Sequence, residues 1–340
     1  MIISITIDDR AGGIAESLVS YSKALEIINE NHLIILPDKA NVIEVLEKIS
    51  NVQLVKIPKY LLKFHTKTKF FFHNHIKGLL KKSKYIFIHN SKLILYLNKF
   101  ENKVALINHS GRLTNLNHKG CNIFLTSSAM KRFLKKFPLN EAKNIIIPHG
   151  FSEPQLGFID SSSNIKNLRV IAAGRFIEKK GFEVLIKAAY LIKKRNLDIK
   201  IKIYGKGPLE KKFKNKIKKY KLTNVSLCGW TSNLNEAFKE SDVFCIPSFI
   251  EPFGLVIGEA MACGLPVIAS NTDGAKEIFG SYPENNGGII VSISSPDELM
   301  KAMIKMQNKN FRDKLSKLGK KNIRKNFSLN KLALNLKKII

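Results

Sequence analysis

The sequence predicts an α/β protein with two domains, each built on a parallel sheet. Its 340 residues fit two domains of about 150 residues each. Short β-rich runs alternate with segments of helical periodicity along the whole chain, a pattern typical of βαβ units and parallel sheets. The polar segment from Phe158 to Asn164 separates two such series. We therefore expect two Rossmann-like domains that face each other across a cleft, with ligands at the carboxyl ends of their strands.

The first domain is expected at residues 1–162. Its strands are predicted at Ile2–Ile7, Leu33–Leu36, Val52–Val55, Tyr85–His89, Val104–Asn108, Ile123–Thr126 and Asn144–Ile147. Its helices are predicted at Ile14–Asn29, Val42–Ser50, Tyr60–Lys82 and Ala129–Phe137. The alternation of the two sets predicts a largely parallel sheet.

The second domain is expected at residues 163–325 and repeats this plan. Its strands are predicted at Leu168–Ala172, Ile199–Tyr204, Val225–Leu227, Val243–Ile246 and Val267–Ser270. Its helices are predicted at Phe182–Arg195, Leu209–Tyr220, Leu234–Lys239 and Leu255–Cys263. The chain after Pro296 is predicted to be helical throughout, and a last helix at 326–340 is expected to return to the first domain.

The composition excludes a disordered chain, because 44% of the residues are hydrophobic and 25% are charged. The 57 Lys and Arg against 27 Asp and Glu give a net charge of +30. Such an excess favours an anionic partner, such as nucleic acid, acidic lipid or a phosphorylated substrate. A coding bias is the alternative, since the chain is rich in Lys, Asn and Ile together.

The four cysteines lie far apart and form no CxxC pair, which predicts reduced thiols in a cytosolic protein and no metal site. The first residues lack the basic start and the long apolar run of a signal peptide. The longest apolar stretch, Val243–Ala269, is interrupted by two glutamates and three prolines. We therefore expect a cytoplasmic protein that is soluble or lies on the surface of a membrane.

Two carboxylates in the second half are placed to hold one ligand. Pro252 is suited to start a helix and Gly264 to end it, so Glu251 lies at the mouth of the helix and Glu259 about two turns inside. Eight residues of helix span at most ~12 Å, enough for two carboxylates to grip hydroxyl groups at both ends of one ligand. The amide groups between them favour an anion; these belong to Phe253, Gly254 and Leu255. Two surface glutamates on an ordinary amphipathic helix are the alternative.

This stretch resembles the Glu-x7-Glu motif of the family 4 retaining glycosyltransferases of the GT-B fold. The resemblance extends over nearly the whole second half, in the order of the family. It includes Gly174-Arg175 and Lys180-Gly181, Gly205-Lys-Gly207, Gly229-Trp230 and the run Ser241–Ser248.

The resemblance implies a nucleotide-sugar donor as substrate and no metal or cofactor. Arg175 and Lys180 follow a strand and precede a helix, so both cations can neutralise the diphosphate as it leaves. By the same resemblance, Glu251 would bind sugar hydroxyls and Glu259 the ribose hydroxyls. The amides of Phe253, Gly254 and Leu255 would contact the sugar and phosphate. Trp230 would lie near the base, and Gly205 and Gly207 would form a tight turn beside the nucleotide.

The first half resembles the family less closely and is expected to bind the acceptor. Gly12 and Gly13 resemble the glycine-rich loop after the first strand, where the backbone approaches the donor phosphates. His109 follows a strand where the family often has a histidine that faces the reacting sugar. A structural histidine and an ordinary glycine turn are the alternatives. His149 stands where the family has an asparagine, so no role is assigned to it.

A lysine-rich region spans residues 56–84. Between Glu47 and Glu101 the chain has no acidic residue and many lysines, and aromatic residues are mixed with them. A basic helix with apolar and aromatic residues is typical of proteins that bind an anionic membrane surface. A solvated lysine face is the alternative.

These patterns favour a retaining glycosyltransferase that moves a sugar from a nucleotide sugar to a glycan or glycolipid acceptor, in lipopolysaccharide or other surface-glycan synthesis at the inner membrane face. The alternatives are another GT-B enzyme, such as a phosphorylase or sugar-nucleotide epimerase, a pseudoenzyme of that fold, and a nucleic-acid-binding protein. The last is disfavoured because the basic residues are spread over both halves and no nucleic-acid-binding motif is present.

Overall fold

The structure is a computed structural model that describes residues 1–10, 12–65, 74–97, 100, 103–109, 120–152, 167–231 and 233–340. The predicted linker at 158–164 lies outside these residues. The chain divides into two compact units, one of Met1–Ser152 with Phe327–Ile340 and one of Glu153–Asn326. The last helix of the chain therefore belongs to the first unit.

The first unit is built on a seven-stranded sheet in which all neighbouring strands are parallel. The order across the sheet is β3-β2-β1-β4-β5-β6-β7. The strands are β1 (Ile2–Ile5), β2 (His32–Pro37), β3 (Val52–Ile57), β4 (Tyr85–Ile88), β5 (Val104–Asn108), β6 (Cys121–Phe124) and β7 (Lys143–Ile146). Several strands are buried on both faces, as expected for a parallel sheet covered by helices.

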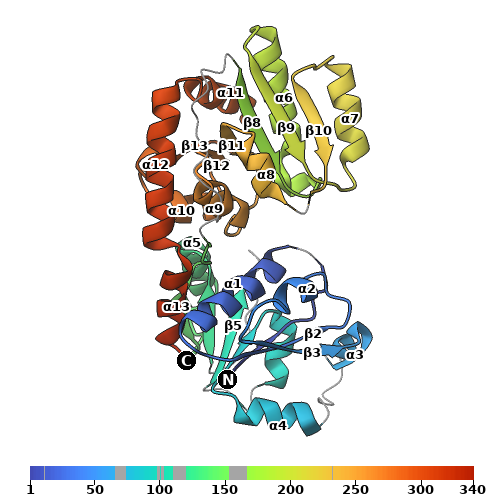
Figure 1. Cartoon of the computed structure of the whole chain (residues 1–340), viewed down its shortest axis with the longest axis vertical. Helices are drawn as coiled ribbons and strands as arrows, with labels where there is room; N and C mark the ends of the chain where they lie inside the picture. The colour runs from blue at the N-terminus through green and yellow to red at the C-terminus, as the bar shows by residue number, and fades with distance from the viewer. Residues whose placement is uncertain are drawn as a thin grey trace. The chain divides into compact units, whose positions relative to one another are not determined.

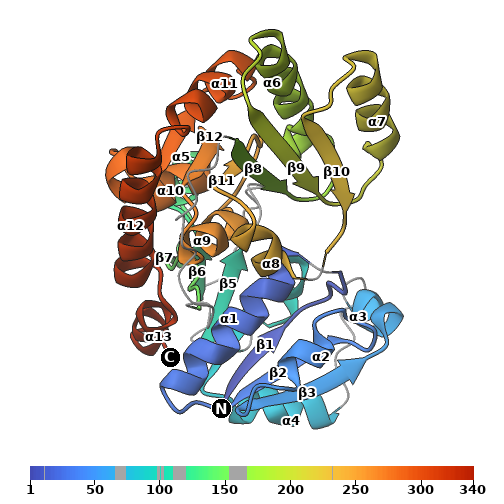
Figure 2. The ribbon, with the colours of Figure 1, turned by 45° about the horizontal axis from the view of Figure 1, so that its top comes forward.

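Helices cover both faces of this sheet (Figure 2). The helices are α1 (Gly13–Ile27), α2 (Ile43–Leu46), α3 (Lys59–His65), α4 (Asn74–Lys82), α5 (Ser127–Lys136) and α13 (Leu329–Lys337), with a 3₁₀ turn η1 (Ser91–Tyr96). On one face α1 and α2 pack against β2, and on the other α3, α4 and η1 pack against β1, β4 and β5. The helix predicted over Tyr60–Lys82 is two helices in the described residues, and 66–73 lie outside them.

The second unit is built on a six-stranded parallel sheet with the order β10-β9-β8-β11-β12-β13 (Figure 1). The strands are β8 (Leu168–Ala173), β9 (Ile199–Tyr204), β10 (Val225–Gly229), β11 (Val243–Ile246), β12 (Val267–Ser270) and β13 (Gly288–Val291). The helices are α6 (Phe182–Lys194), α7 (Glu210–Lys219), α8 (Leu234–Lys239), α9 (Leu255–Ala262), α10 (Asp273–Phe279), α11 (Pro296–Lys305) and α12 (Lys309–Asn326), with 3₁₀ turns η3 (Glu178–Lys180) and η4 (Pro283–Asn286). Its main core lies between the sheet and α6, α7 and α11.

In each sheet the order of the strands reverses at one point. The reversal lies between β1 and β4 in the first unit and between β8 and β11 in the second. The loops that follow these two strands diverge to opposite faces, and the crevice at their carboxyl ends is where open α/β sheets bind ligands. This confirms the two predicted Rossmann-like domains and marks one candidate binding edge in each unit.

Candidate active site

An ion pair joins the two loops at the reversal point of the second sheet. Lys180 is the last residue of η3, after β8, and Glu251 lies in the loop after β11. The Lys180 Nζ is 2.5 Å from the Glu251 Oε2, and the side chains are only 17% and 12% exposed. The Ser248 hydroxyl donates to the same carboxylate oxygen at 3.2 Å. The structure thus brings together two residues that are 71 positions apart in the sequence.

Backbone packing holds the two loops at this distance. The Phe249 amide donates to the Lys179 carbonyl at 2.8 Å. Gly181 has a φ of +65°, and a Cβ there would lie 2.0 Å from the Pro247 carbonyl oxygen. Only glycine fits this position, so the glycine of the Lys180-Gly181 pair is required by close contact between the loops.

Three cations gather at this edge. Arg175 and Lys179 are exposed, whereas Lys180 is half-buried. Partial burial and the like charges of Lys180 and Arg175 lower the pKa of Lys179, and Glu251 opposes this effect. An anion at this edge would relieve the repulsion among these like charges.

The helix that carries Glu259, α9, begins at Leu255, as the predicted range Leu255–Cys263 has it, but Pro252 lies outside it. Gly254 precedes the helix with a φ of +84°. A left-handed residue cannot continue a helix toward Pro252, which explains why Pro252 does not start it. Glu259 is consequently about one turn inside α9 and half-buried, and the first-turn amides of α9, which have no partner within the helix, lie close to Glu251 in the chain.

The other predicted donor-binding residues follow β9 and β10. A Cβ at Gly205, where φ is +150°, would lie 1.9 Å from the Gly174 carbonyl oxygen, and a Cβ at Gly207 would lie 2.6 Å from that of Phe176. Both glycines therefore let the loop after β9 pack against the loop after β8. Trp230 follows β10 and is 63% exposed, so its ring is free to stack on a planar group.

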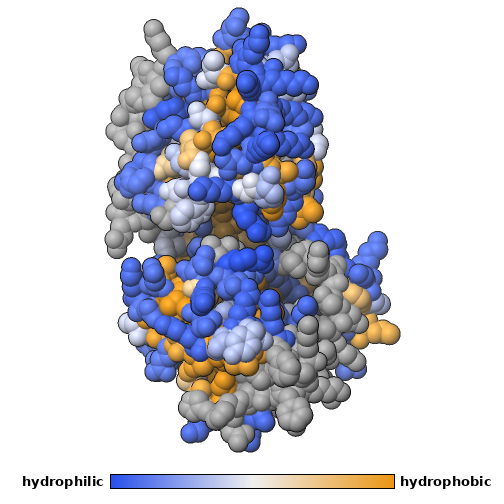
Figure 3. Space-filling model, turned by 90° about the vertical axis from the view of Figure 1, so that its right-hand side faces the viewer, coloured by the Kyte–Doolittle hydropathy of each residue, from blue (hydrophilic) through white to orange (hydrophobic). Residues whose placement is uncertain are grey.

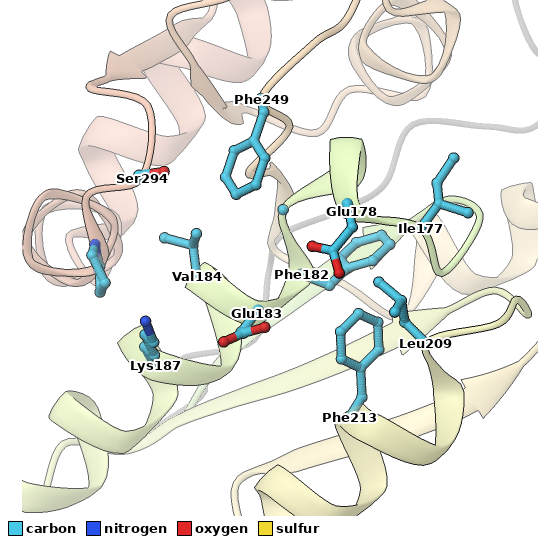
Figure 4. Close-up of a pocket in the computed structure, with 12 residues that line it drawn as sticks. Ile177, Glu178, Phe182, Glu183, Val184, Lys187, Leu209, Phe213, Phe249 and Ser294 are labelled. Carbon is cyan, nitrogen blue, oxygen red and sulfur yellow. The ribbon is translucent and has the colours of Figure 1, made fainter.

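A cavity of about 230 Å³ lies beside the loops after β8 and β11, whose residues Gly181 and Phe249 line it (Figure 4). Its apolar walls include Phe182, Phe213 and Phe249, and its polar rim includes Glu178 and Glu183. Both carboxylates already pair with lysines, since Lys212 contacts both. The cavity is smaller than the roughly 300–1,000 Å³ of typical ligand pockets, so the strand ends remain the candidate binding edge.

In the first unit, His109 lies directly after β5 and is half-buried. Its Nε2 is 2.9 Å from the Nδ1 of His89, which follows β4. The His109 ring stacks on the rings of His89 and His149, with centroid separations of 5.1 and 6.0 Å. Burial lowers the pKa of His109 to about 4, and the nearby Asp8 carboxylate opposes this shift. A pKa this low keeps the ring uncharged at neutral pH.

The two glycines predicted to approach the donor lie at the start of α1. Gly12 precedes the helix with a φ of +145°, and Gly13 is its first residue. The preceding loop is fixed by Asn90, whose Oδ1 accepts hydrogen bonds from the Thr6 hydroxyl and the Ile7 amide at 3.0 and 2.8 Å. Gly12 therefore lies in the segment after β1, and His109 lies directly after β5.

Sequence reasoning did not find several of these contacts. The sequence places Ser248 only within a motif, and it assigns no role to His89, Lys179 or Asn90. Their signal was present, because each lies within two residues of a strand end or of a predicted site residue. Their partners follow from the order of the strands in the sheet, which the sequence does not state.

Several lysines of the lysine-rich region already pair with carboxylates. Lys56 pairs with Glu47 at 2.6 Å, and Lys59 and Lys84 pair with Asp9 and Glu30. In α3 the residue Tyr60 is 70% exposed. Figure 3 shows hydrophobic side chains scattered among hydrophilic ones on one face of the molecule. Among the described residues no helix has the length and apolar character to span a bilayer.

The two units identify the fold. Two Rossmann-like parallel-sheet units, each with a binding edge at a strand reversal, form the GT-B fold of glycosyltransferases. Anabaena HepE, solved in complex with UDP and glucose, matches 99% of this chain and 98% of its own, with a TM-score of 0.75 at 17% identity.

Residues 158–325, most of the second unit, match the family model described as glycosyl transferases group 1. An uncharacterized glycosyltransferase of Methanocaldococcus jannaschii is 25% identical over 240 residues, 64% of each chain. A putative colanic acid biosynthesis glycosyltransferase of Escherichia coli, WcaL, is 30% identical over 134 residues, 35% of this chain and 33% of that protein. The matches thus span less than two thirds of these relatives.

Proposed function

We propose that this protein is a retaining glycosyltransferase of the family 4 type, which moves a sugar from a nucleotide-sugar donor to a glycan or lipid-linked acceptor without a metal. One observation carries the proposal: the Lys180–Glu251 pair spans the strand reversal of the second unit, beside Arg175. A cation and a carboxylate held together there offer one group for a diphosphate and one for sugar hydroxyls.

The cations act on the leaving group. As the bond between the anomeric carbon and the phosphate oxygen breaks, negative charge grows on the diphosphate. Arg175 and Lys180 stabilise that charge, an electrostatic effect that is strongest when the donors are already in position. The ion pair with Glu251 supplies this preorganisation for Lys180, because it fixes a long flexible side chain before the donor binds.

The carboxylates orient the donor. Glu251 accepts hydrogen bonds from sugar hydroxyls and Glu259 from the ribose hydroxyls. The amides of Phe253, Gly254 and Leu255 contact the sugar and phosphate, as expected at a helix N-terminus, and Trp230 stacks on the base. In the first unit, His109 accepts a hydrogen bond from a substrate hydroxyl.

Retention follows from a same-face route. The acceptor oxygen bonds to the anomeric carbon on the face from which the nucleotide leaves, and the departing phosphate oxygen takes the acceptor's proton. One C–O bond breaks and one forms, so no covalent enzyme intermediate is needed.

The acceptor is proposed to be a surface glycan or its lipid-linked precursor, such as the lipopolysaccharide core, at the inner face of the cytoplasmic membrane. The partial match to a colanic acid biosynthesis protein supports a surface glycan. The exposed Tyr60 and the basic helix α4 support contact with an anionic membrane surface.

The donor is tested first by thermal shift with UDP, GDP, ADP and CMP. A ligand at 100 times its Kd stabilises the native state by about 2.7 kcal/mol, so one nucleotide should raise the Tm and Glu259→Ala should abolish the rise. Glu236→Ala is the matched control, since Glu236 is exposed on α8 and pairs only with Lys239 among the described residues. With the matching sugar nucleotide, retention is read from the anomeric configuration of the product by NMR. A chain that binds none of the nucleotides and forms no product from their sugars contradicts the proposal.

The membrane contact is tested by co-sedimentation with vesicles rich in phosphatidylserine or made of phosphatidylcholine alone. Lys77→Glu with Lys81→Glu reverses two exposed charges on α4 and should weaken binding to the anionic vesicles. Lys214→Glu with Lys218→Glu makes the same charge change on α7 and should not. Equal losses in both variants would mean that only net charge matters.

A further inference from the structure

A chain of hydrogen bonds crosses four adjacent strands of the first unit and ends at His109. Ser22 on α1, His32 on β2, Ser4 on β1 and His89 after β4 are all buried. The successive distances are 2.8 Å from Ser22 Oγ to His32 Nδ1, 2.7 Å from His32 Nε2 to Ser4 Oγ, 3.4 Å from Ser4 Oγ to His89 Nε2, and 2.9 Å from His89 Nδ1 to His109 Nε2. The strands follow the order β2-β1-β4-β5, so the series of hydrogen bonds crosses from β1 to β4, where the strand order reverses.

The histidines in this chain of hydrogen bonds are uncharged at neutral pH. Burial lowers the pKa of His32 to about 3 and that of His109 to about 4, and burial together with its histidine neighbours holds the pKa of His89 well below its usual value. A neutral imidazole has one N–H donor and one bare nitrogen that accepts. Each hydrogen bond in this series therefore has one donor and one acceptor. Once the direction of the first hydrogen bond is known, the directions of all the others follow.

The first link is fixed by a backbone carbonyl. The Ser22 hydroxyl donates to the Leu18 carbonyl oxygen at 2.8 Å, and a carbonyl can only accept. The single hydroxyl proton of Ser22 is then used, so His32 Nδ1 must carry a proton and donate to Ser22. His32 Nε2 is consequently bare and accepts from Ser4.

The same reasoning carries the direction to His109. The Ser4 proton is used on His32, so His89 Nε2 must donate to Ser4, and His89 Nδ1 is bare. A bare Nδ1 can accept only if His109 Nε2 carries the proton. The remaining nitrogen of His109, Nδ1, is therefore bare.

We propose that this chain of hydrogen bonds from Ser22 to His109, called the relay below, holds His109 in its Nε2–H tautomer. The Nδ1 of His109 then presents a lone pair at the carboxyl edge of the first sheet and selects a substrate group that donates a hydrogen bond. His109 is the residue that touches substrate, and Ser22, His32, Ser4 and His89 are positioning residues. A sugar or acceptor hydroxyl satisfies this requirement, whereas a phosphate or carboxylate oxygen does not. The substrate role rests on the proposed function; the tautomer does not.

The arrangement of His89 and His109 does not suit metal binding. The His89 and His109 rings lie nearly parallel, at 15°, and are joined nitrogen to nitrogen, so both of those nitrogens are already used. Within the described residues, no group of three or more His, Cys, Asp or Glu is arranged to hold a metal ion.

The tautomer is measured by ¹⁵N NMR on histidine-labelled full-length protein without ligand. His109→Gln identifies the His109 signals, and the protonated nitrogen of the native ring should be Nε2. Ser22→Ala removes the group that sets the direction, and His109 should then lose its single Nε2–H form although Ser22 is four links away. Ser20→Ala is the matched control, because Ser20 is also buried on α1 and its hydroxyl donates to a backbone carbonyl, that of Ser17. Ser20 is not part of the series of hydrogen bonds that ends at His109. It should leave the His109 signals unchanged.

The outcomes separate the relay from the proposed function. An Nδ1–H form of His109 in the native protein, or a Ser22→Ala spectrum equal to that of Ser20→Ala, overturns the relay whatever the enzyme does. If the tautomer is as inferred, Ser22→Ala should lower kcat/KM for sugar transfer by about 2- to 10-fold, the worth of one neutral hydrogen bond, and Ser20→Ala should not. A native tautomer with no transferase activity refutes the proposed function and leaves the relay intact.

Discussion

Lys179 and Lys180 are neighbours in the sequence but differ in their surroundings. Lys180 is half-buried against Glu251, whereas Lys179 is exposed. If Lys180 stabilises the leaving diphosphate, Lys180→Met should lower kcat by about 10²- to 10³-fold, the range for loss of one transition-state donor. Lys179→Met removes the same charge one residue away and should have a much smaller effect. Steady-state kinetics of both variants provide the measurement, and equal losses would show that this edge acts only through its total charge.

The sequence was sufficient to select several of the site residues but not all of their partners. Arg175, Lys180 and Glu251 were predicted to act at one site, and the structure brings Lys180 and Glu251 into contact. His109 was predicted on its position at a strand end, but not its contact with His89. That contact depends on β4 and β5 being neighbours in the sheet, and a pattern of local periodicity carries no information about which strands pair.

At the scale of the elements, the turn between β9 and α7 depends on Gly205. Gly205 and Gly12 have similar φ values, +150° and +145°, but a Cβ would lie 1.9 Å from a carbonyl oxygen at Gly205 and would meet nothing within 4 Å at Gly12. Gly12→Ala should therefore cost only backbone strain, about 1–3 kcal/mol, and Gly205→Ala should cost clearly more. Urea unfolding of the two variants tests this, and equal destabilisation would mean that φ alone decides.

The last helix, α13, packs against α1 of the first unit. Leu336 is fully buried there, while Leu334 on the same helix is 57% exposed. Leu336→Ala should destabilise the first unit by about 2–5 kcal/mol, and Leu334→Ala should change little. Hydrogen exchange followed by mass spectrometry locates the effect, which should appear in residues 1–152 and 327–340. Faster exchange throughout the second unit would contradict this assignment.

Most elements were predictable because their apolar runs are long enough to show a period. The exceptions have physical reasons. Helix α10 begins Asp273-Gly274, which is typical of a turn, yet Gly274 is needed because a Cβ there would lie 2.0 Å from the Phe253 carbonyl oxygen. Strand β13 follows Gly287 and begins with Gly288, so only a short apolar run remains. In both cases tertiary packing outweighs local preference.

At the scale of the whole molecule, the titratable groups are unevenly divided between the units. All eight histidines precede residue 150, so the second unit has none. The second unit instead contains Glu183, whose pKa is lowered to about 2 by hydrogen bonds from Lys212 and Lys216. Its stabilising effect is present above the carboxyl's ordinary pKa of 4.5 and is lost below that value. The two units should consequently respond to acid in different pH ranges.

Between pH 6.5 and 4.5 the first unit should lose stability while the second keeps it. An unfolded histidine binds its proton near 6.5, but folding lowers the pKa of His32 and His149 to about 3 and that of His109 to about 4. In this range the unfolded chain therefore binds more protons, so the free energy of unfolding falls as the pH falls, by about 1.4 kcal/mol per pH unit for each histidine. At pH 5 this amounts to roughly 2 kcal/mol for each. Hydrogen exchange at pH 7 and pH 5, corrected for the intrinsic rate, measures the opening free energy in each unit. An equal decrease in both units, or none in the first, would show that these histidines are not held neutral by burial.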